Sequence, residues 1–201
     1  MFVLPEGLPL ELTPLAFLVG KWSGSGVISY KRDGDESPTV EREFSQQIEF
    51  ANDGQNVLTY ISNVKLSDDS GLVLPSELGY WRIARPSESA DHGPGLMLGV
   101  GEKSLQTHED LEKLRNKEGG FDIQVSVLHP GGMAELYNGK IKGARVDLAS
   151  AHGAAFDTAK VYRHSTRLYG QVEGALLWVW DIALGDNQLK PHASARLERV
   201  E

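Results

Sequence analysis

The feature that most constrains the fold of this chain is a period-two alternation of apolar and polar residues. Between Val40 and Phe50 the even positions are mainly apolar and the odd positions are all polar. Phe121, Ile123, Val125 and Val127 alternate with polar residues in the same way. Alternate residues of a β-strand face opposite sides, so each segment is expected to be a half-buried strand. Two such segments so far apart each need an apolar partner face, which predicts an all-β domain.

Further candidate strands recur along the chain, which brings the count to about eleven. They lie at 22–31, 56–66, 77–84, 95–100, 132–138, 140–148, 158–169, 174–183 and 192–200. Turn-forming residues separate many of them, at Asp33-Gly34, Asn52-Asp53-Gly54, Pro130-Gly131-Gly132, Asn138-Gly139 and Gly185-Asp186-Asn187. Short strands joined by tight turns are typical of an antiparallel barrel or sandwich.

Only two segments have a helical pattern. Thr13 to Leu18 places a capping residue before Pro14 and a run of apolar residues, so it predicts a short helix that plugs one end of the barrel. Residues 104–118 carry Thr107 and Asp110 at capping-box spacing but offer few apolar anchors. We expect this insertion to be exposed, mobile or weakly helical, and dispensable for folding.

Length and composition limit the classes of protein that the chain can belong to. A chain of 201 residues fits a single domain, 1–201, and no apolar run is long enough for a transmembrane helix. Residues 1–6 lack the basic segment of a secretory signal, so we expect a cytoplasmic protein. A net charge of -8 disfavours nucleic-acid binding. The absence of cysteine excludes disulfides, thiolate nucleophiles, iron–sulfur clusters and covalently attached haem.

A glycine-rich motif, G-x-W-x-G-x-G, spans residues 20–26. Glycine permits close backbone approach, and Trp22 can cover the end of a barrel, so the residues themselves favour a structural role. The motif lacks the P-loop lysine and precedes a strand instead of a helix, which argues against a nucleotide site.

Histidines are the strongest candidate ligands that remain. The six of them lie at 92, 108, 129, 152, 164 and 192, and no pair has zinc-hydrolase spacing. His129 is expected to be a turn residue and His164 a cross-strand polar group. His192 opens the last candidate strand, but strict alternation groups it with the polar residues. It would face the interior only if a bulge or a partly polar lumen interrupted that alternation.

Two tryptophans, Trp178 and Trp180, share one face of a candidate strand. Such a stripe is compatible with core packing and equally with the lining of a flat ligand cavity. No spacing indicates a Ser-His-Asp triad, and the chain has no Gly-x-Ser-x-Gly elbow.

Three segments together resemble the nitrobindin family, which is also described as fatty-acid-binding-protein-like and as peroxynitrite isomerases. They are the G-x-W-x-G-x-G motif, residues 128–135 with the sequence L-H-P-G-G-M-A-E, and Pro191-His192 at the start of the last strand. The likeness spans residues 12–200 except for much of 86–120.

The resemblance implies a ten-stranded antiparallel β-barrel of the lipocalin or fatty-acid-binding-protein type that holds one non-covalent ferric haem b. It implies that His192 is the iron ligand and the catalytic residue, and that Thr39 lies at the distal side of the haem and contributes to cofactor binding. The implied activities are conversion of peroxynitrite to nitrate and binding of nitric oxide. Pro75 stands where some relatives place a histidine, and the insertion is longer than usual, so the distal pocket is expected to differ.

Two alternatives remain open at this point. The barrel could be a haem-free carrier of a small hydrophobic ligand, or a structural barrel without a ligand. The sequence also leaves open whether the protein forms a homodimer.

Overall fold

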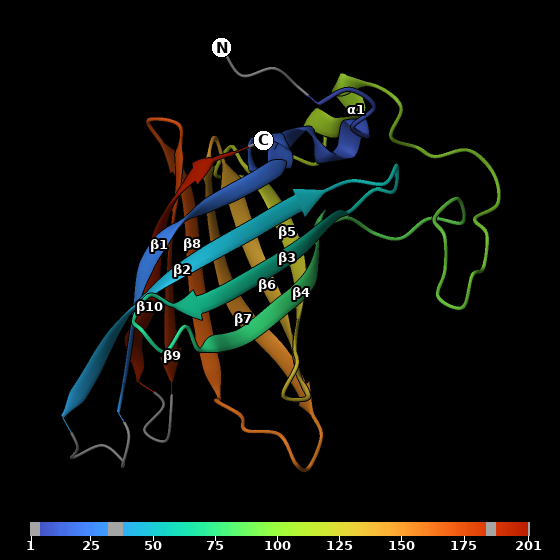
Figure 1. The fold of residues 1–201 in the computed structure, drawn as a ribbon. Coiled ribbons are helices and arrows are strands. Elements are labelled where there is room, and N and C mark those ends of the chain that lie inside the picture. Colours follow the sequence, from blue (N-terminus) through green and yellow to red (C-terminus); the bar gives the residue numbers. More distant parts are fainter. Residues whose placement is uncertain (1–4, 32–37, 184–187, 201) are drawn as a thin grey trace.

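The computed structural model describes residues 5–31, 38–183 and 188–200. Ten antiparallel strands form a closed barrel in which each strand pairs with its neighbours in sequence and β1 pairs with β10 (Figure 1). The strands are β1 (Gly20–Lys31), β2 (Thr39–Ala51), β3 (Leu58–Leu66), β4 (Val73–Ile83), β5 (Phe121–His129), β6 (Met133–Lys142), β7 (Arg145–Ala155), β8 (His164–Val172), β9 (Ala175–Ala183) and β10 (Leu189–Arg199). The barrel fold predicted from the sequence is confirmed.

The alternation that predicted the strands also describes which side chains fill the barrel. In β2 the buried residues are Phe44, Gln46, Ile48 and Phe50, and in β5 they are Phe121, Ile123, Val125 and Val127. Large aromatic side chains pack across the middle of the lumen, where Trp81 contacts Phe50 and Tyr169 edge-on at 5.3 and 5.1 Å between ring centroids. The barrel is therefore filled at this level.

A 3-10 helix, η1 (Leu10–Leu18), covers the end of the barrel at the top of Figure 1. It begins three residues earlier than the sequence predicted, and Pro14 lies within it. Leu12, Leu15 and Leu18 are fully buried beneath it. The Trp22 indole donates a hydrogen bond to the Leu18 carbonyl at 2.7 Å. The expected plug is present, and any ligand must enter from the opposite end.

The glycine motif lets β1 approach β10 closely. A Cβ atom at Gly24 would lie 2.2 Å from the Arg196 carbonyl oxygen, and one at Gly26 would lie 2.2 Å from that of Ser194. Distances this short are steric clashes, so these two glycines allow the first and last strands to close the barrel.

Three predictions made from local patterns were wrong. Asn138-Gly139 lies inside β6 and is not a turn, because Gly139 is needed where a Cβ would lie 2.4 Å from the Asp147 carbonyl oxygen. Residues 95–100 form no strand. Val161 precedes β8, which begins only at His164. The turns predicted at 33–34 and 185–187 lie outside the described residues.

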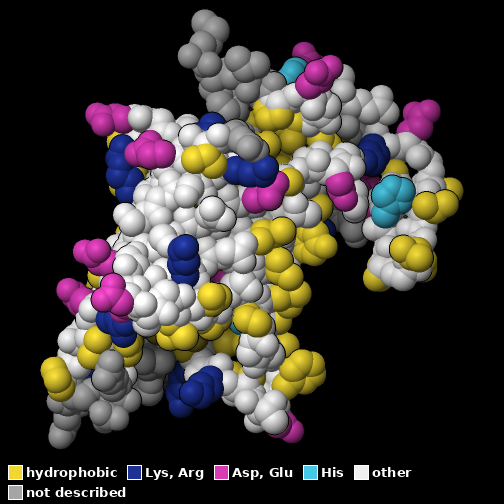
Figure 2. Space-filling view, viewed as in Figure 1, with side chains coloured by type: hydrophobic (Ala, Val, Ile, Leu, Met, Phe, Trp, Pro, Cys, Tyr) yellow, Lys and Arg dark blue, Asp and Glu magenta, His cyan; other side chains and the backbone are white. Residues whose placement is uncertain are grey.

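The insertion between β4 and β5 differs from the expected mobile segment. It contains the helix α1 (His108–Glu112), which carries the predicted capping box between Thr107 and Asp110. Leu111 is 4% exposed and belongs to the hydrophobic core, and Leu105 and Leu114 pack against it. In contrast, residues 93–101 project from the barrel and bear exposed hydrophobic side chains, seen in yellow on the protruding segment in Figure 2. Part of the insertion is thus an anchored element.

None of the helices among the described residues is both long and apolar enough to span a membrane.

Candidate functional site

A cavity of about 470 Å³ opens into the barrel at the end opposite η1. This volume is within the usual range for sites that bind small molecules or cofactors. Its wall is mainly apolar and aromatic, with contributions from Ile28, Phe44, Tyr60, Val64, Leu74, Pro75, Met133, Trp178 and Trp180. Both tryptophans of the β9 stripe therefore line the cavity, which agrees with the second of the two interpretations offered by the sequence.

His192 lines this cavity because the pairing of β10 with β9 is irregular at that point. Pro191 pairs with Asp181 and Ala193 pairs with Trp180, so His192 has no residue directly opposite it. A bulge of this kind turns the side chain away from the face that strict alternation assigns to it. The condition that the sequence set for an inward-facing His192 is met.

The hydrogen bond of His192 determines which ring nitrogen is available to a ligand. Nδ1 lies 3.1 Å from the carbonyl oxygen of Ser29, which can only accept a hydrogen bond, so Nδ1 carries the proton. In the neutral ring Nε2 then keeps its lone pair. Burial lowers the pKa of His192, and the Ser29 carbonyl opposes that effect only in part. The imidazole is thus held neutral, in the tautomer that a metal ion requires at Nε2.

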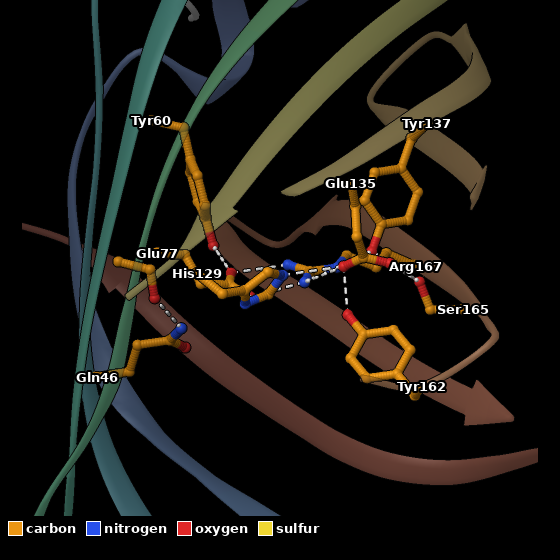
Figure 3. Close-up of polar contacts among 10 residues, drawn as sticks. Gln46, Tyr60, Glu77, His129, Glu135, Tyr137, Tyr162, Ser165 and Arg167 are labelled. Atoms are coloured by element: carbon orange, nitrogen blue, oxygen red, sulfur yellow. Dashed lines mark hydrogen bonds and ion pairs between the residues drawn. The ribbon is translucent and has the colours of Figure 1, made fainter. Parts of the chain in front are cut away.

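Beside the apolar wall lies a buried network of charged and polar groups, which we call the polar network (Figure 3). It comprises Tyr60, Glu77, His129, Glu135, Tyr137, Tyr162, Ser165 and Arg167. Arg167 donates two hydrogen bonds to Glu77, at 2.7 and 2.6 Å. Glu135 accepts hydrogen bonds from Tyr137 and Ser165, at 2.8 and 2.9 Å, and from Tyr162.

The two carboxylates of the network remain ionised in spite of their burial. Burial alone would raise the pKa of Glu77, but the Arg167 guanidinium outweighs it and holds the pKa below the usual value. Burial would likewise raise the pKa of Glu135, but hydrogen bonds from His129 and Tyr162 and the charge of Arg167 lower it to about 2. Each carboxylate therefore depends on its partners.

His129 connects the polar network to the cavity. Its Nε2 lies 2.9 Å from Oε2 of Glu135, and its Nδ1 lies 3.6 Å from Oε1 of Glu77. Its ring stacks on Trp180 at 6.2 Å between centroids, with 15° between the planes. The interpretation of His129 as a simple turn residue was wrong, because it ends β5 and is held between two carboxylates.

The remaining candidates lie apart from this cluster. Thr39 is the exposed first residue of β2 and is not part of the cavity lining. His164 is exposed at the start of β8. Its assignment as a surface polar group agrees with the structure, while the cofactor-binding role of Thr39 stays a prediction.

Sequence reasoning missed Glu77, Glu135 and Arg167. Each sits on the inward side of its strand, between buried residues two positions away. A charged residue at an inward position of a period-two pattern was the available signal. Among the described residues there is no group of three or more His, Asp or Glu side chains that could hold a metal ion. An iron atom in the cavity would therefore need ligands other than protein carboxylates.

Comparisons with known proteins agree with this architecture. Residues 11–199 match a family described as "THAP4-like, heme-binding beta-barrel domain". A protein of Leifsonia xyli subsp. xyli named "Peroxynitrite isomerase" is 47% identical over 201 residues, which cover the whole of both chains. A protein of the same name from Kocuria rhizophila is 43% identical and covers 98% of this chain and 95% of its own. The crystal structure of Rv2717c from M. tuberculosis superposes with a TM-score of 0.68 at 23% identity, and covers 96% of this chain and 99% of its own.

Proposed function

Because the chain belongs to the family of THAP4-like, heme-binding beta-barrel domains, we propose that it holds one non-covalent b-type haem in the barrel cavity and converts peroxynitrite to nitrate. Full-length relatives that share 47% and 45% of its residues bear the name peroxynitrite isomerase. The observation that carries the proposal is the state of His192. Its imidazole is neutral, lines an apolar cavity and has Nδ1 engaged by Ser29.

The residues of the cavity fit a haem group. The chain has no cysteine, so a haem can be held only by contacts and by an axial side chain. His192 offers Nε2 to ferric iron, and the Ser29 carbonyl fixes the ring orientation. Phe44, Trp178 and the other apolar residues of the wall would cover the porphyrin faces. Lys160, which is in the lining and exposed, would pair with a haem carboxylate.

Bound haem supplies the coordination of peroxynitrite and its rearrangement to nitrate, and it also supplies a binding position for nitric oxide. The protein contributes confinement and electrostatics. The apolar wall limits the access of water, so that fragments of a broken O–O bond recombine before they escape. Neutral His192 binds the iron without first losing a proton.

The polar network keeps its own charges balanced beside this apolar wall. The Glu77 carboxylate is neutralised by Arg167, and Glu135 is surrounded by hydrogen-bond donors. Because these groups are mutually satisfied, the network offers no uncompensated charge to an incoming anion. We propose that this balance lets an anionic substrate enter a cavity that has two carboxylates close by.

The experiment is a haem titration of three proteins followed by Soret absorbance, with peroxynitrite decay measured on the same samples. The wild type, His192→Ala and His164→Ala are compared, and the last is a matched control because His164 is exposed on the barrel rim. We expect His192→Ala alone to lose haem retention and accelerated decay. Equal spectra and equal decay rates in all three proteins would refute the proposal.

The carrier of a small hydrophobic ligand is retained as the second candidate because the cavity wall is mainly apolar and aromatic. In that case a fluorescent fatty-acid analogue should bind wild type and His192→Ala equally, and haem should not displace it. Cytoplasmic location, a single domain over 1–201, a distal role for Thr39 and a homodimer also stay predictions.

A further inference from the structure

Tyr162 lies at the end of a chain of aromatic contacts that starts at His192. The indole of Trp180 meets the His192 ring edge-on, with 5.1 Å between centroids and 82° between planes. On its other side Trp180 meets Tyr162 at 5.8 Å and 71°. Trp180 and Tyr162 both line the cavity. An oxidant in the cavity therefore has two oxidisable rings within reach, and they touch each other.

Trp180 is poorly suited to remain oxidised. The Arg167 guanidinium carbon lies 4.1 Å from the centre of its ring, and a positive charge at this distance disfavours a second one on the indole. The indole could become neutral by releasing its Nε1 proton, but this buried nitrogen has no hydrogen-bond partner within the described ranges. Neither route by which a tryptophan radical is stabilised is present at Trp180.

Tyr162 has the opposite surroundings. Its phenol donates a hydrogen bond to Oε2 of Glu135, whose pKa of about 2 leaves it ionised at neutral pH. A phenol that has lost an electron is a strong acid, so its proton passes readily to a carboxylate already in hydrogen-bond contact. Tyr137 also donates to Glu135, but its ring lies beneath the Arg167 guanidinium at 5.4 Å, and it is not part of the cavity lining.

We propose that Tyr162 is a redox-active residue, at which a one-electron oxidation begun in the cavity comes to rest, with Trp180 as the relay and Glu135 as the proton acceptor. The source of the oxidant rests on the proposed function. Homolysis of the O–O bond of peroxynitrite yields nitrogen dioxide, a one-electron oxidant. Nitrogen dioxide gains one electron and becomes nitrite, the O–H bond of Tyr162 breaks, and its proton moves to Glu135. The products are nitrite, a neutral phenoxyl radical and a protonated carboxyl group.

This assignment gives the cavity a second activity. Nitrogen dioxide that fails to recombine into nitrate would be reduced to nitrite at the cost of one tyrosine electron. A reductant that later returns the electron to Tyr162 would complete a one-electron cycle. Tyr162 would then dispose of the radical that the isomerisation lets escape.

The first experiment uses haem-free protein, so that it does not depend on the proposed function. Azide radicals generated by pulse radiolysis oxidise the protein by one electron, and freeze-quenched samples are read by electron paramagnetic resonance. Wild type, Tyr80→Phe and Tyr30→Phe should give a tyrosyl signal, and Tyr162→Phe should lose most of it. Tyr80 is 54% exposed and is therefore the residue that accessibility alone would select.

Two further measurements test the relay and the proton acceptor. Trp180→Phe should slow the appearance of the tyrosyl signal, and wild type in heavy water should form it more slowly because a proton moves with the electron. A full tyrosyl signal in Tyr162→Phe, or a persistent indolyl radical in wild type, would overturn the proposal.

The second experiment adds peroxynitrite to haem-loaded protein and reads the same signal. A tyrosyl radical that requires Tyr162 supports the proposal. If haem does not accelerate peroxynitrite decay but the haem-free protein still forms the Tyr162 radical, the proposed isomerase function fails while the assignment of Tyr162 stands.

Discussion

Arg167 and Glu77 form a two-pronged ion pair inside the barrel although they are 90 residues apart in the sequence. The guanidinium of Arg167 in β8 and the carboxylate of Glu77 in β4 face each other across the lumen, with N–O distances of 2.7 and 2.6 Å. Both side chains are at least nine-tenths buried. Each charge is satisfied mainly by the other, which makes the pair costly to break from one side.

Removal of the carboxylate charge in Glu77→Gln should destabilise the protein by about 3–5 kcal/mol, because Arg167 would remain buried without a counter-ion. Urea denaturation measures the loss. Glu198→Gln is the matched control, since Glu198 pairs with Arg196 at the exposed surface and its loss should cost less than about 1 kcal/mol. Equal, small losses in both variants would contradict the importance of the buried pair.

Glu135 should make stability fall in acid. Its pKa is about 2 in the folded protein against a usual 4.5, so the folded state binds fewer protons than the unfolded state between these values. Stability from this group is full above about pH 5 and is lost as the pH falls towards 2. Glu135→Gln should be less stable at pH 7 and show a flatter decline over that range. A decline as steep as that of wild type would show that other carboxyl groups cause it.

His192 should bind haem over a wider acidic range than an ordinary histidine. Burial lowers its pKa below 6.5, so the neutral ring persists as the pH falls through that value. Haem affinity should be constant from pH 7.5 to about 6.5 and should decline only at lower pH. Titration of haem at several pH values tests this expectation, and a decline centred above pH 6.5 would argue against a buried neutral ligand.

The anchored part of the insertion should matter for folding, contrary to the expectation from its composition. Leu111→Ala should cost about 2–5 kcal/mol, because this side chain is buried in the core cluster. Leu98→Ala, in the projecting part, removes a side chain that is 81% exposed and should change the free energy of unfolding by less than about 0.5 kcal/mol. Thermal denaturation of the two variants separates these outcomes.

Gly26→Ala should weaken the closure of the barrel. The new methyl group would lie 2.2 Å from the Ser194 carbonyl oxygen and 2.5 Å from the Phe44 ring, so β1 and β10 must separate. Because the Ser29 carbonyl holds His192 across the same pair of strands, haem affinity should fall together with the thermal midpoint. Gly131→Ala adds a methyl group with nothing within 4 Å and is the control. Unchanged haem affinity in a destabilised Gly26→Ala would separate the two effects.

The fold could be predicted from the sequence because the barrel is built from the pattern that is easiest to read. The alternations in β2 and β5 have regular ladders on both sides, and their inward residues are apolar, apart from Gln46. Where a glycine serves close packing, local rules misled, as at Asn138-Gly139, because the same residue type also forms turns.

The site was only partly predictable for a different reason. His192 was found through a resemblance, and its orientation depends on an irregular pairing that alternation alone cannot locate. The polar network brings together residues from β4, β6 and β8, and pairwise contacts over such separations are absent from any local pattern. An inward-facing charge could have been noticed at each position, but its partner could not have been named.

The bulge at His192 separates the choice of cofactor from the choice of fold. A residue without an opposite partner contributes little to the register of β10, since that register is set by Ala193, Ala195 and Leu197 on one side of the strand and by the pairing with β1. The imidazole can therefore be exchanged by a single substitution while the barrel keeps its shape. For protein design this makes position 192 an interchangeable mount: a lining of fixed geometry to which different axial ligands, or none, can be fitted without rebuilding the ten strands around it.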